Sequence, residues 1–344
     1  MSTNKVLITG SCGLVGSEAV HYFLNLNFEV IGIDNNNRGS WFNGASTSIV
    51  LNSLKKMKHY SHNDFSIIEA KKVQKLIKTT KPDLIIHCAA QPSHDKSAEI
   101  PLDDFATNAF GTMSLLDPVR RYCPDSPFIY ISTNKVYGDR PNKIPMKESD
   151  LRFDYNDPEF ENGINEQMSI DQCLHSPFGG SKLSADIMVQ EYGRYYDMPT
   201  ACFRCGCITG IRQQGVKLHG FLSHLCKTAR DEKLFTIYGH KGKQVRDNIH
   251  SYDLVSAFYE FYKNPKSGVV YNIGGGKENS CSILEAISLI EKISGIAMKT
   301  SYDKGRKGDH ICYYTDCSKF KSEYPEWNKT MSLNDILNEM LLTK

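Results

Sequence analysis

Long hydrophobic runs are missing from this sequence. No uninterrupted apolar stretch reaches 18 residues anywhere in the 344-residue chain, which argues against a transmembrane helix. The opening segment, MSTNKVLITG, also lacks the basic region followed by an apolar one that marks a secretory signal. We therefore expect a cytoplasmic protein without a membrane partner.

An excess of one charge is missing as well. The chain has 41 Lys and Arg against 39 Asp and Glu, a net charge of +2. This balance favours neither a basic polyphosphate-binding tail nor a membrane-surface patch, so we predict no nucleic-acid partner. Internal repeats, low-complexity tracts and linker-like runs are also lacking, and the length suffices for one large or two modest domains.

A disulfide framework is the third absence. The 11 cysteines are odd in number and scattered, which suits reduced thiols in a cytosol. The segment CFRCGC resembles metal-ligand spacing, but it lies in a predicted strand, where side chains alternate between faces. Cys202 would then point away from Cys205 and Cys207, leaving two thiols where zinc usually takes four ligands, so we predict no metal.

What the sequence does contain is an alternation of short apolar strands with helical patterns over its first 200 residues. The strands read KVLITG, FEVIGID, PDLIIHCAA, PFIYIST and TACFRCG, and the intervening helices are predicted over 14–26, 70–80, 103–122 and 176–196. Continuous apolar strands between amphipathic helices are typical of a parallel sheet covered on both faces. We therefore predict an α/β fold with a Rossmann-type doubly wound parallel sheet.

The alternation becomes irregular beyond Gly206. A smaller α+β substrate domain at the C-terminal edge of the sheet is predicted from this change. The predicted boundaries are 1–206 for the Rossmann-type domain, with 240–263 returning to it, and 207–239 with 264–344 for the second domain. The polar stretch 141–175 is too long for a plain connection, so we expect a functional loop or flap there.

A glycine-rich turn follows the first strand. In ITGSCGLVG, Gly10 permits a tight turn, Gly13 lets the backbone approach a pyrophosphate, and Gly16 lets the helix pack against the strand. The free N–H groups of that helix would face the phosphates. A glycine-rich turn can be merely a turn, but the strand before it and the helix after it favour dinucleotide binding.

Asp34 ends the second strand, 18 residues after Gly16. A carboxylate there accepts hydrogen bonds from ribose hydroxyls and repels a 2′-phosphate, which favours NAD over NADP. Arg38 is a counter-signal, because it could pair with that phosphate. Asp34 could also simply cap a turn, and Asp64 fits either an adenine contact or a surface acid. His87, in the strand PDLIIHCAA, fits a packed core residue better than a ligand.

Several motifs occur together in one order along nearly the whole chain. They are TGSCGLVG, CAAQPSHD, NAFGT, STNKVYGD, the helix bearing Lys182, KQVRDNIHSYD and RKGD. In this combination the sequence resembles the extended short-chain dehydrogenase/reductase family, specifically its nucleotide-sugar epimerases and dehydratases, and is most similar to the CDP-tyvelose (CDP-paratose) 2-epimerase branch.

The resemblance implies a chemistry in which NAD takes a hydride from a sugar carbon and returns it after the configuration has changed. In the 2-epimerase branch the oxidised carbon would be C2 of a CDP-linked sugar. Alternatives are a 4-epimerase, another NAD-dependent nucleotide-sugar oxidoreductase, or a catalytically silent protein that binds NAD or sugar nucleotides. A homodimer is also implied, built from the helices after NAFGT and over 176–196.

The resemblance further implies site residues. Lys182 would hydrogen-bond the nicotinamide ribose and Thr133 would orient the sugar oxygen. Dehydratases carry an Asp-Glu pair after that threonine, whereas this chain has Asn134 and Lys135, so 4,6-dehydration is not expected. The predicted cofactor contacts are Gly10, Cys12, Gly13, Leu14, Val15, Gly16, Asp34, Asn35, Arg38, Asp64, Ala89, Ala90, Gln91, Asn108 and Lys182.

One position departs from the family. The family's base is a tyrosine where this chain has Phe178, four residues before Lys182. A phenyl ring exchanges no proton, and losing a general acid–base group typically costs 10²–10⁴-fold in rate. Either another group has taken the role, or the chemistry is slow or altered, or turnover is lost. The candidate replacements are His94, Asp95, Lys135, Tyr137, His175, Cys205 and Cys207.

Substrate contacts are implied in the C-terminal half and next to the fourth strand. Arg246 and Arg306 would bind the diphosphate from distant segments at a cleft between the domains, using guanidinium geometry suited to phosphate. A solvated surface charge is the alternative for Arg246 and for Lys217. The predicted substrate residues are Ser93, His94, Asn134, Cys207, Lys217, His219, Gln244, Arg246, Arg306 and Asp309.

Overall fold

The computed structural model describes residues 3–42, 45–213, 220–306 and 308–342. The chain divides into two compact units, each built from three segments. Unit 1 comprises Met1–Thr133, Pro177–Arg204 and Val255–Tyr271, and unit 2 comprises Asn134–Ser176, Cys205–Leu254 and Asn272–Lys344.

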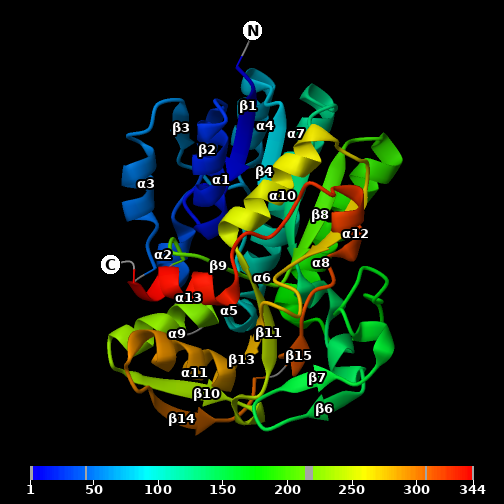
Figure 1. Ribbon diagram of the computed structural model, residues 1–344. Coiled ribbons are helices and arrows are strands. Elements are labelled where there is room, and N and C mark those ends of the chain that lie inside the picture. The colour runs from blue at the N-terminus through cyan, green and yellow to red at the C-terminus, as the bar shows by residue number, and fades with distance from the viewer. Residues whose placement is uncertain (1–2, 43–44, 214–219, 307, 343–344) are drawn as a thin grey trace. The chain divides into compact units, whose positions relative to one another are not determined.

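Unit 1 is built on a seven-stranded sheet of order β12-β8-β5-β4-β1-β2-β3 (Figure 1). Along the chain its strands are β1 (Lys5–Thr9), β2 (Glu29–Ile33), β3 (Tyr60–Asn63), β4 (Leu84–His87), β5 (Phe128–Thr133), β8 (Thr200–Cys205) and β12 (Val269–Ile273). The pairings of β1 with β2 and β4, of β2 with β3, and of β4 with β5 are all parallel. The predicted parallel α/β sheet is therefore confirmed.

Helices connect these strands. They are α1 (Leu14–Asn25), α2 (Asn37–Trp41), α3 (Ser48–Leu54), α4 (Ala70–Thr80), α5 (His94–Glu99), α6 (Pro101–Phe105), α7 (Gly111–Tyr122), α8 (Ser176–Tyr196) and α10 (Ser251–Lys263). The helix predicted over 103–122 is not regular, because a π-helical turn, Ala106–Phe110, joins α6 to α7. A π-turn of this kind often accompanies a functional site, and here it carries Asn108.

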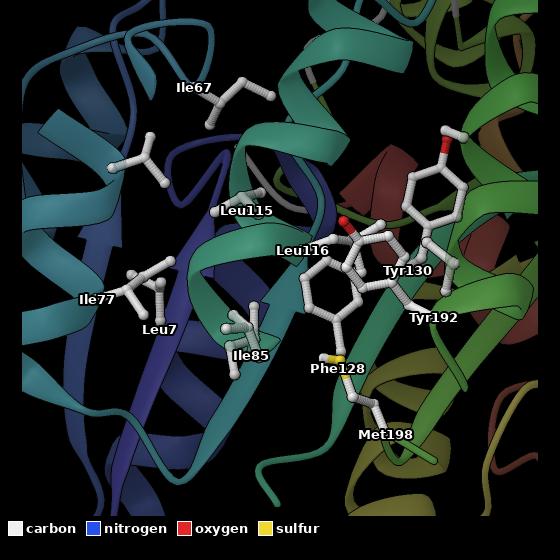
Figure 2. Packing of buried hydrophobic residues seen from close by; sticks show 14 of the residues in the cluster. Leu7, Ile67, Ile77, Ile85, Leu115, Leu116, Phe128, Tyr130, Tyr192 and Met198 are labelled. Atoms are coloured by element: carbon white, nitrogen blue, oxygen red, sulfur yellow. The ribbon is translucent and has the colours of Figure 1, made fainter. Parts of the chain in front are cut away.

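The core of unit 1 lies where α4, α7 and α8 cover the sheet (Figure 2). Leu7 and Ile85 from the strands pack with Leu115 and Val119 from α7, and all four are fully buried. The central strands read as uninterrupted apolar runs because both faces of a covered parallel sheet are removed from water.

Unit 2 contains shorter strands and four helices within the described residues. Its strands are β6 (Met146–Glu148), β7 (Phe153–Tyr155), β9 (Cys207–Thr209), β10 (Leu234–Tyr238), β11 (Val245–His250), β13 (Ser280–Ser282), β14 (Lys299–Asp303) and β15 (Cys312–Tyr313). Its helices are α9 (Phe221–Arg230), α11 (Ile283–Ser294), α12 (Ser318–Glu323) and α13 (Leu333–Leu342). A second hydrophobic core joins α9, α11 and α13 to β10.

The polar stretch 141–175 is partly ordered into secondary structure. β6 and β7 pair as an antiparallel hairpin within it. A short 3-10 helix, Pro158–Phe160, follows the hairpin. Strands β3, β11 and β14 and helix α13 were not anticipated from the sequence, because each is short or gives no uninterrupted apolar signal.

Candidate functional site

The glycine-rich turn between β1 and α1 is closely packed. Gly10 has φ +66°, a left-handed conformation that favours glycine. A Cβ on Gly16 would lie 2.0 Å from the Gly10 carbonyl oxygen, so only glycine fits where α1 approaches the turn. α1 begins at Leu14 after Gly13, and no side chain caps its first turn among the described residues. Its free N–H groups are therefore available to an anion.

Asp34 stands beside this turn at the end of β2. One carboxylate oxygen accepts the Cys12 N–H at 3.0 Å and the other accepts the Asn36 N–H at 2.9 Å. Burial, followed by the nearby Asp34 charge, raises the pKa of the Cys12 thiol to about 12, so that thiol is neutral. Asp34 thus holds the turn, as the alternative interpretation expected. Its Oδ1 also accepts the Thr47 hydroxyl at 3.5 Å, so Oδ2 is the oxygen that keeps a further lone pair for a ligand.

The other predicted cofactor residues near β2 and β3 are placed as follows. Asn35 accepts the Asn37 N–H in the loop before α2. The Arg38 guanidinium lies 5.2 Å from the centre of the Phe42 ring. Asp64 directly follows β3 and is exposed.

His87 is a buried core residue, as predicted. Thr112 donates its hydroxyl to the Asn108 carbonyl and so accepts from His87 Nε2 at 2.9 Å. The Thr9 hydroxyl accepts the Ala89 N–H and therefore donates to His87 Nδ1 at 2.7 Å. Burial, with the nearby Lys182 charge, holds the pKa of His87 well below its usual value. The ring is neutral and carries its proton on Nε2.

A buried polar network ties the loop after β4 to the first turn of α8. Asn108 donates to the Gln91 carbonyl and to Ser181 Oγ, and its side-chain oxygen accepts the Gln91 N–H. Ser181 in turn donates to Asp104 at 2.5 Å. Burial raises the pKa of Asp104. Asn108 and Gln91, predicted as cofactor contacts, therefore fix the position of α8, and Ala89 and Ala90 lie in the loop they support.

Lys182 and Phe178 lie one helical turn apart on α8. The Lys182 ammonium donates to the Ile131 carbonyl at 2.6 Å and lies 4.2 Å from the centre of the Tyr130 ring. Lys182 is 4 % exposed and Phe178 is 7 % exposed. The Phe178 N–H donates to Ser97 Oγ on α5 at 3.1 Å. Thr133 ends β5 two residues after Ile131, so the strand whose carbonyl accepts from Lys182 also carries Thr133.

A buried ion pair on the same helix was not identified from the sequence. Arg204 on β8 donates to both oxygens of Asp186 on α8, at 2.8 and 3.1 Å. Ser132 and Gln190 also donate to that carboxylate, at 2.5 and 2.7 Å. The sequence signal was weak, because a single Asp in an amphipathic helix usually faces solvent.

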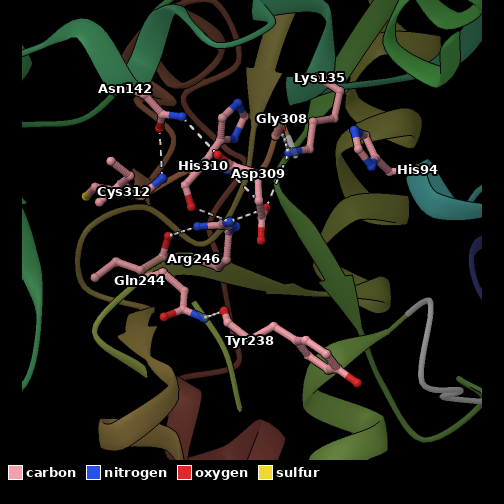
Figure 3. A network of polar contacts seen from close by, with 12 residues as sticks. His94, Lys135, Asn142, Tyr238, Gln244, Arg246, Gly308, Asp309, His310 and Cys312 are labelled. Atoms are coloured by element: carbon pink, nitrogen blue, oxygen red, sulfur yellow. Dashed lines mark hydrogen bonds and ion pairs between the residues drawn. The ribbon is translucent and has the colours of Figure 1, made fainter. Parts of the chain in front are cut away.

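Within unit 2, Arg246 on β11 is paired with protein groups (Figure 3). It donates to Asp309 at 2.5 Å and to the His310 carbonyl at 2.6 Å. Lys135 donates to the Gly308 carbonyl at 3.2 Å and lies 3.5 Å from Asp309. Although burial alone would raise it, Arg246 and Lys135 together hold the pKa of Asp309 below its usual range.

His310 adds a fixed polar ring to this network. Its Nε2 lies 2.8 Å from the Gly138 carbonyl, which can only accept, so the proton is on Nε2. Its Nδ1 is buried and has no hydrogen-bond partner in the part of the chain that the structure describes. Burial and the charges of Lys135 and Arg246 hold the pKa of His310 well below its usual value. His310 stayed outside the predicted site although it adjoins Asp309.

The remaining predicted substrate residues of unit 2 have contacts of their own or lie outside the described residues. Gln244 donates to the Tyr238 carbonyl at 2.9 Å, and its side-chain oxygen is buried with no hydrogen-bond partner within the described ranges. The Arg306 guanidinium lies 4.6 Å from the centre of the Tyr238 ring. Asn134 begins a 3-10 helix and is 7 % exposed. Lys217 and His219 lie outside the described residues.

Besides Lys135, four candidate replacements for the missing hydroxyl lie in unit 2 and are constrained there. Burial raises the pKa of the Cys207 thiol to about 12. His175 has a backbone carbonyl facing each ring nitrogen, at 2.9 and 3.1 Å. Tyr137 is fully buried and donates to Asn272 at 2.7 Å, in line with its interpretation as a packing residue. Cys205, at the end of β8, is 2 % exposed.

The cysteines of the structure are free thiols throughout the described residues. That part of the chain contains no group of three or more His, Cys, Asp or Glu side chains arranged to hold a metal ion. Its helices include none that is long and apolar enough to cross a membrane.

Comparison with known proteins decides the family. Residues 6–274 match the model of the NAD dependent epimerase/dehydratase family. The chain belongs to this family. The predicted family and its cofactor, NAD, are thereby confirmed, together with the Rossmann-type fold.

Individual relatives cover the whole chain. The CDP-paratose 2-epimerase of Salmonella typhi is 33% identical over 344 residues, 98% of each chain. A dTDP-glucose 4,6-dehydratase of Escherichia coli is 29% identical and covers 93% of this chain, with 88% of its own length matched. A solved structure of UDP-glucuronic acid 4-epimerase from Bacillus cereus, in complex with UDP-glucuronic acid and NAD, has a TM-score of 0.81, 26% identity and 98% coverage of both chains.

Proposed function

We propose that this family member is an NAD-dependent epimerase that inverts C2 of a CDP-linked sugar by transient hydride transfer. The observation that carries the proposal is the match to CDP-paratose 2-epimerase along 98% of both chains. Asn134 and Lys135 stand where dehydratases have their Asp-Glu pair, which disfavours the dehydratase activity of the other relatives.

The residues of unit 1 fit NAD. A turn that excludes a Cβ at Gly16, an α1 N-terminus without a side-chain cap, and the Asp34 carboxylate suit a pyrophosphate and a ribose with free hydroxyls. Bound NAD would supply a carbon that accepts and returns a hydride. Asp34 would accept from the ribose hydroxyls, while its existing bonds to Cys12 and Asn36 fix its orientation.

Lys182 would orient the nicotinamide ribose. Its ammonium is already positioned by the Ile131 carbonyl, and its charge would stabilise an oxyanion forming near it. Thr133, on the same strand as Ile131, would hold the reacting hydroxyl. This arrangement needs little reorganisation, because the strand and helix backbones are fixed by the core.

In unit 2, the cationic pair Arg246 and Lys135 would bind the diphosphate. Both now share Asp309, so a phosphate would compete with that carboxylate for the guanidinium. Arg306 and Gln244 would add contacts near Tyr238. The assembly is proposed to be a cytoplasmic homodimer that uses α7 and α8.

Phe178 supports a second candidate, a catalytically silent protein that binds NAD or sugar nucleotides. Proton NMR of CDP-paratose incubated with the protein in D₂O distinguishes the two. Inversion at C2 with its hydrogen retained supports hydride transfer at C2, and deuterium at the inverted carbon contradicts it. Stabilisation of the protein by NAD, without inversion of any CDP-, UDP-, GDP- or dTDP-sugar, would establish the silent protein instead.

A further inference from the structure

We infer that His94 on α5 is the acid–base residue that replaces the missing tyrosine hydroxyl. This inference rests on the proposed function and adds the group that moves the substrate proton. It concerns unit 1 alone, where both the lysine and the phenylalanine of the pair are located.

The placement of His94 follows from one serine. Ser97 Oγ accepts the Phe178 N–H at 3.1 Å and donates to the His94 carbonyl at 2.7 Å. The face of α5 that carries Ser97 therefore packs against the first turn of α8. Since residues three apart share a helix face, His94 belongs to this same face. Ser93 caps the helix by accepting the Lys96 N–H, which fixes where α5 begins.

The ring of His94 has the chemistry of an oriented base. Its Nδ1 lies 3.4 Å from Asp95 Oδ1, and its Nε2 is shielded from solvent and has no hydrogen-bond partner among the described residues. A carboxylate behind one nitrogen leaves the other with a lone pair to accept a proton, and such hydrogen bonds are often long until a ligand is bound. His94 is labelled in Figure 3.

The contrast with His87, at the end of β4, is informative. His87 has a threonine hydroxyl on each nitrogen and is chemically satisfied. A buried polar atom without a partner is destabilising, so an orphaned nitrogen is retained most readily where a ligand group completes it. A sugar hydroxyl is such a group.

The other candidates are less suited to the role. Lys135 is held beside Asp309, His175 faces a backbone carbonyl on each nitrogen, and Tyr137 donates to a buried amide. Burial keeps the Cys207 thiol protonated at neutral pH.

The proton and hydride balance as follows. The C2 hydroxyl proton moves to His94 Nε2 while the hydrogen on C2 leaves as a hydride to NAD, giving a ketone. After the ketone presents its other face, the hydride returns to C2 and the imidazolium returns its proton to the oxygen. No net oxidation occurs. Because Phe178 has no hydroxyl, it does not compete with His94 for this proton.

The test compares His94→Ala with a histidine variant on α1, His21→Ala. Each purified protein is supplied with NAD and CDP-paratose, and C2 inversion is followed by NMR. We expect His94→Ala to lose 10²–10⁴-fold in kcat with unchanged stabilisation by NAD, and His21→Ala to match the parent. Added imidazole should restore part of the lost rate, and so should the double variant His94→Ala/Phe178→Tyr.

Two results would overturn the assignment: His94→Ala within threefold of the parent, or a loss that neither imidazole nor Phe178→Tyr restores. A parent protein that inverts no sugar nucleotide is a separate outcome, because it removes the proposed function and the role of His94 together.

Discussion

Replacing Arg204 by methionine should strongly destabilise unit 1. Arg204 and Asp186 form a bidentate pair with side chains 5% and 0% exposed. Removing one partner of a buried pair typically costs about 3–5 kcal/mol, because it leaves an uncompensated charge. Ser132 and Gln190 would still donate to Asp186, so we expect the lower end, about 3 kcal/mol.

Urea denaturation followed by circular dichroism measures this change. The double variant Arg204→Met/Asp186→Leu should recover most of the loss, since an apolar pair of similar volume replaces a buried ion pair at little cost. Lys72→Met, which removes an exposed ion pair with Glu69 on α4, is the control and should leave the midpoint unchanged. A cost below about 1 kcal/mol for Arg204→Met, or a double variant no more stable than the single one, would refute the reasoning.

Further changes test the cofactor turn and the network of unit 2. Gly16→Ala should abolish stabilisation by NAD in a thermal-shift titration, because its Cβ would clash with the Gly10 carbonyl; stabilisation equal to the parent's would contradict this packing. Asp34→Ala should weaken NAD binding about 10–100-fold, since charged hydrogen bonds contribute about 1.5–3 kcal/mol each, and should reduce the protein's preference for NAD over NADP. Calorimetry measures both affinities, and an unchanged affinity for NAD would exclude Asp34 from the ribose site. Because the folded-state pKa of Asp309 is depressed, its stabilising effect is fully present above pH 4 and is lost as the pH falls below that. Asp309→Asn should therefore lower the urea midpoint at pH 7 but by less at pH 3, and an equal difference at both pH values would show that the charge of Asp309 is not responsible.

Local sequence signals sufficed for the elements that are buried or regular. The strand KVLIT was predictable because its apolar residues are consecutive, and the helix over 70–80 because its apolar residues recur with a 3.6-residue period. Both signals come from residues that are neighbours in sequence. β3 was missed because most of its residues are only half-buried, and β14 because most of its residues are exposed; neither strand alternates clearly between buried and exposed residues. The π-turn at Ala106–Phe110 was missed too, because its cause is the burial of Asn108 against Gln91 and Ser181 rather than any local propensity.

The sequence by itself determined the order of strands and helices, the glycine turn, the acid at Asp34 and the absence of a hydroxyl at Phe178, since each depends on residue identity and spacing along the chain. Only the tertiary structure decided which polar side chains pair with one another. Arg246 could be read as a free phosphate ligand until Asp309, 63 residues away, was found beside it. His94 was one of several candidate residues until Ser97 was found to link its helix to Phe178. Hydrogen-bond partners come from segments that are distant in sequence, so their assignment requires the folded chain.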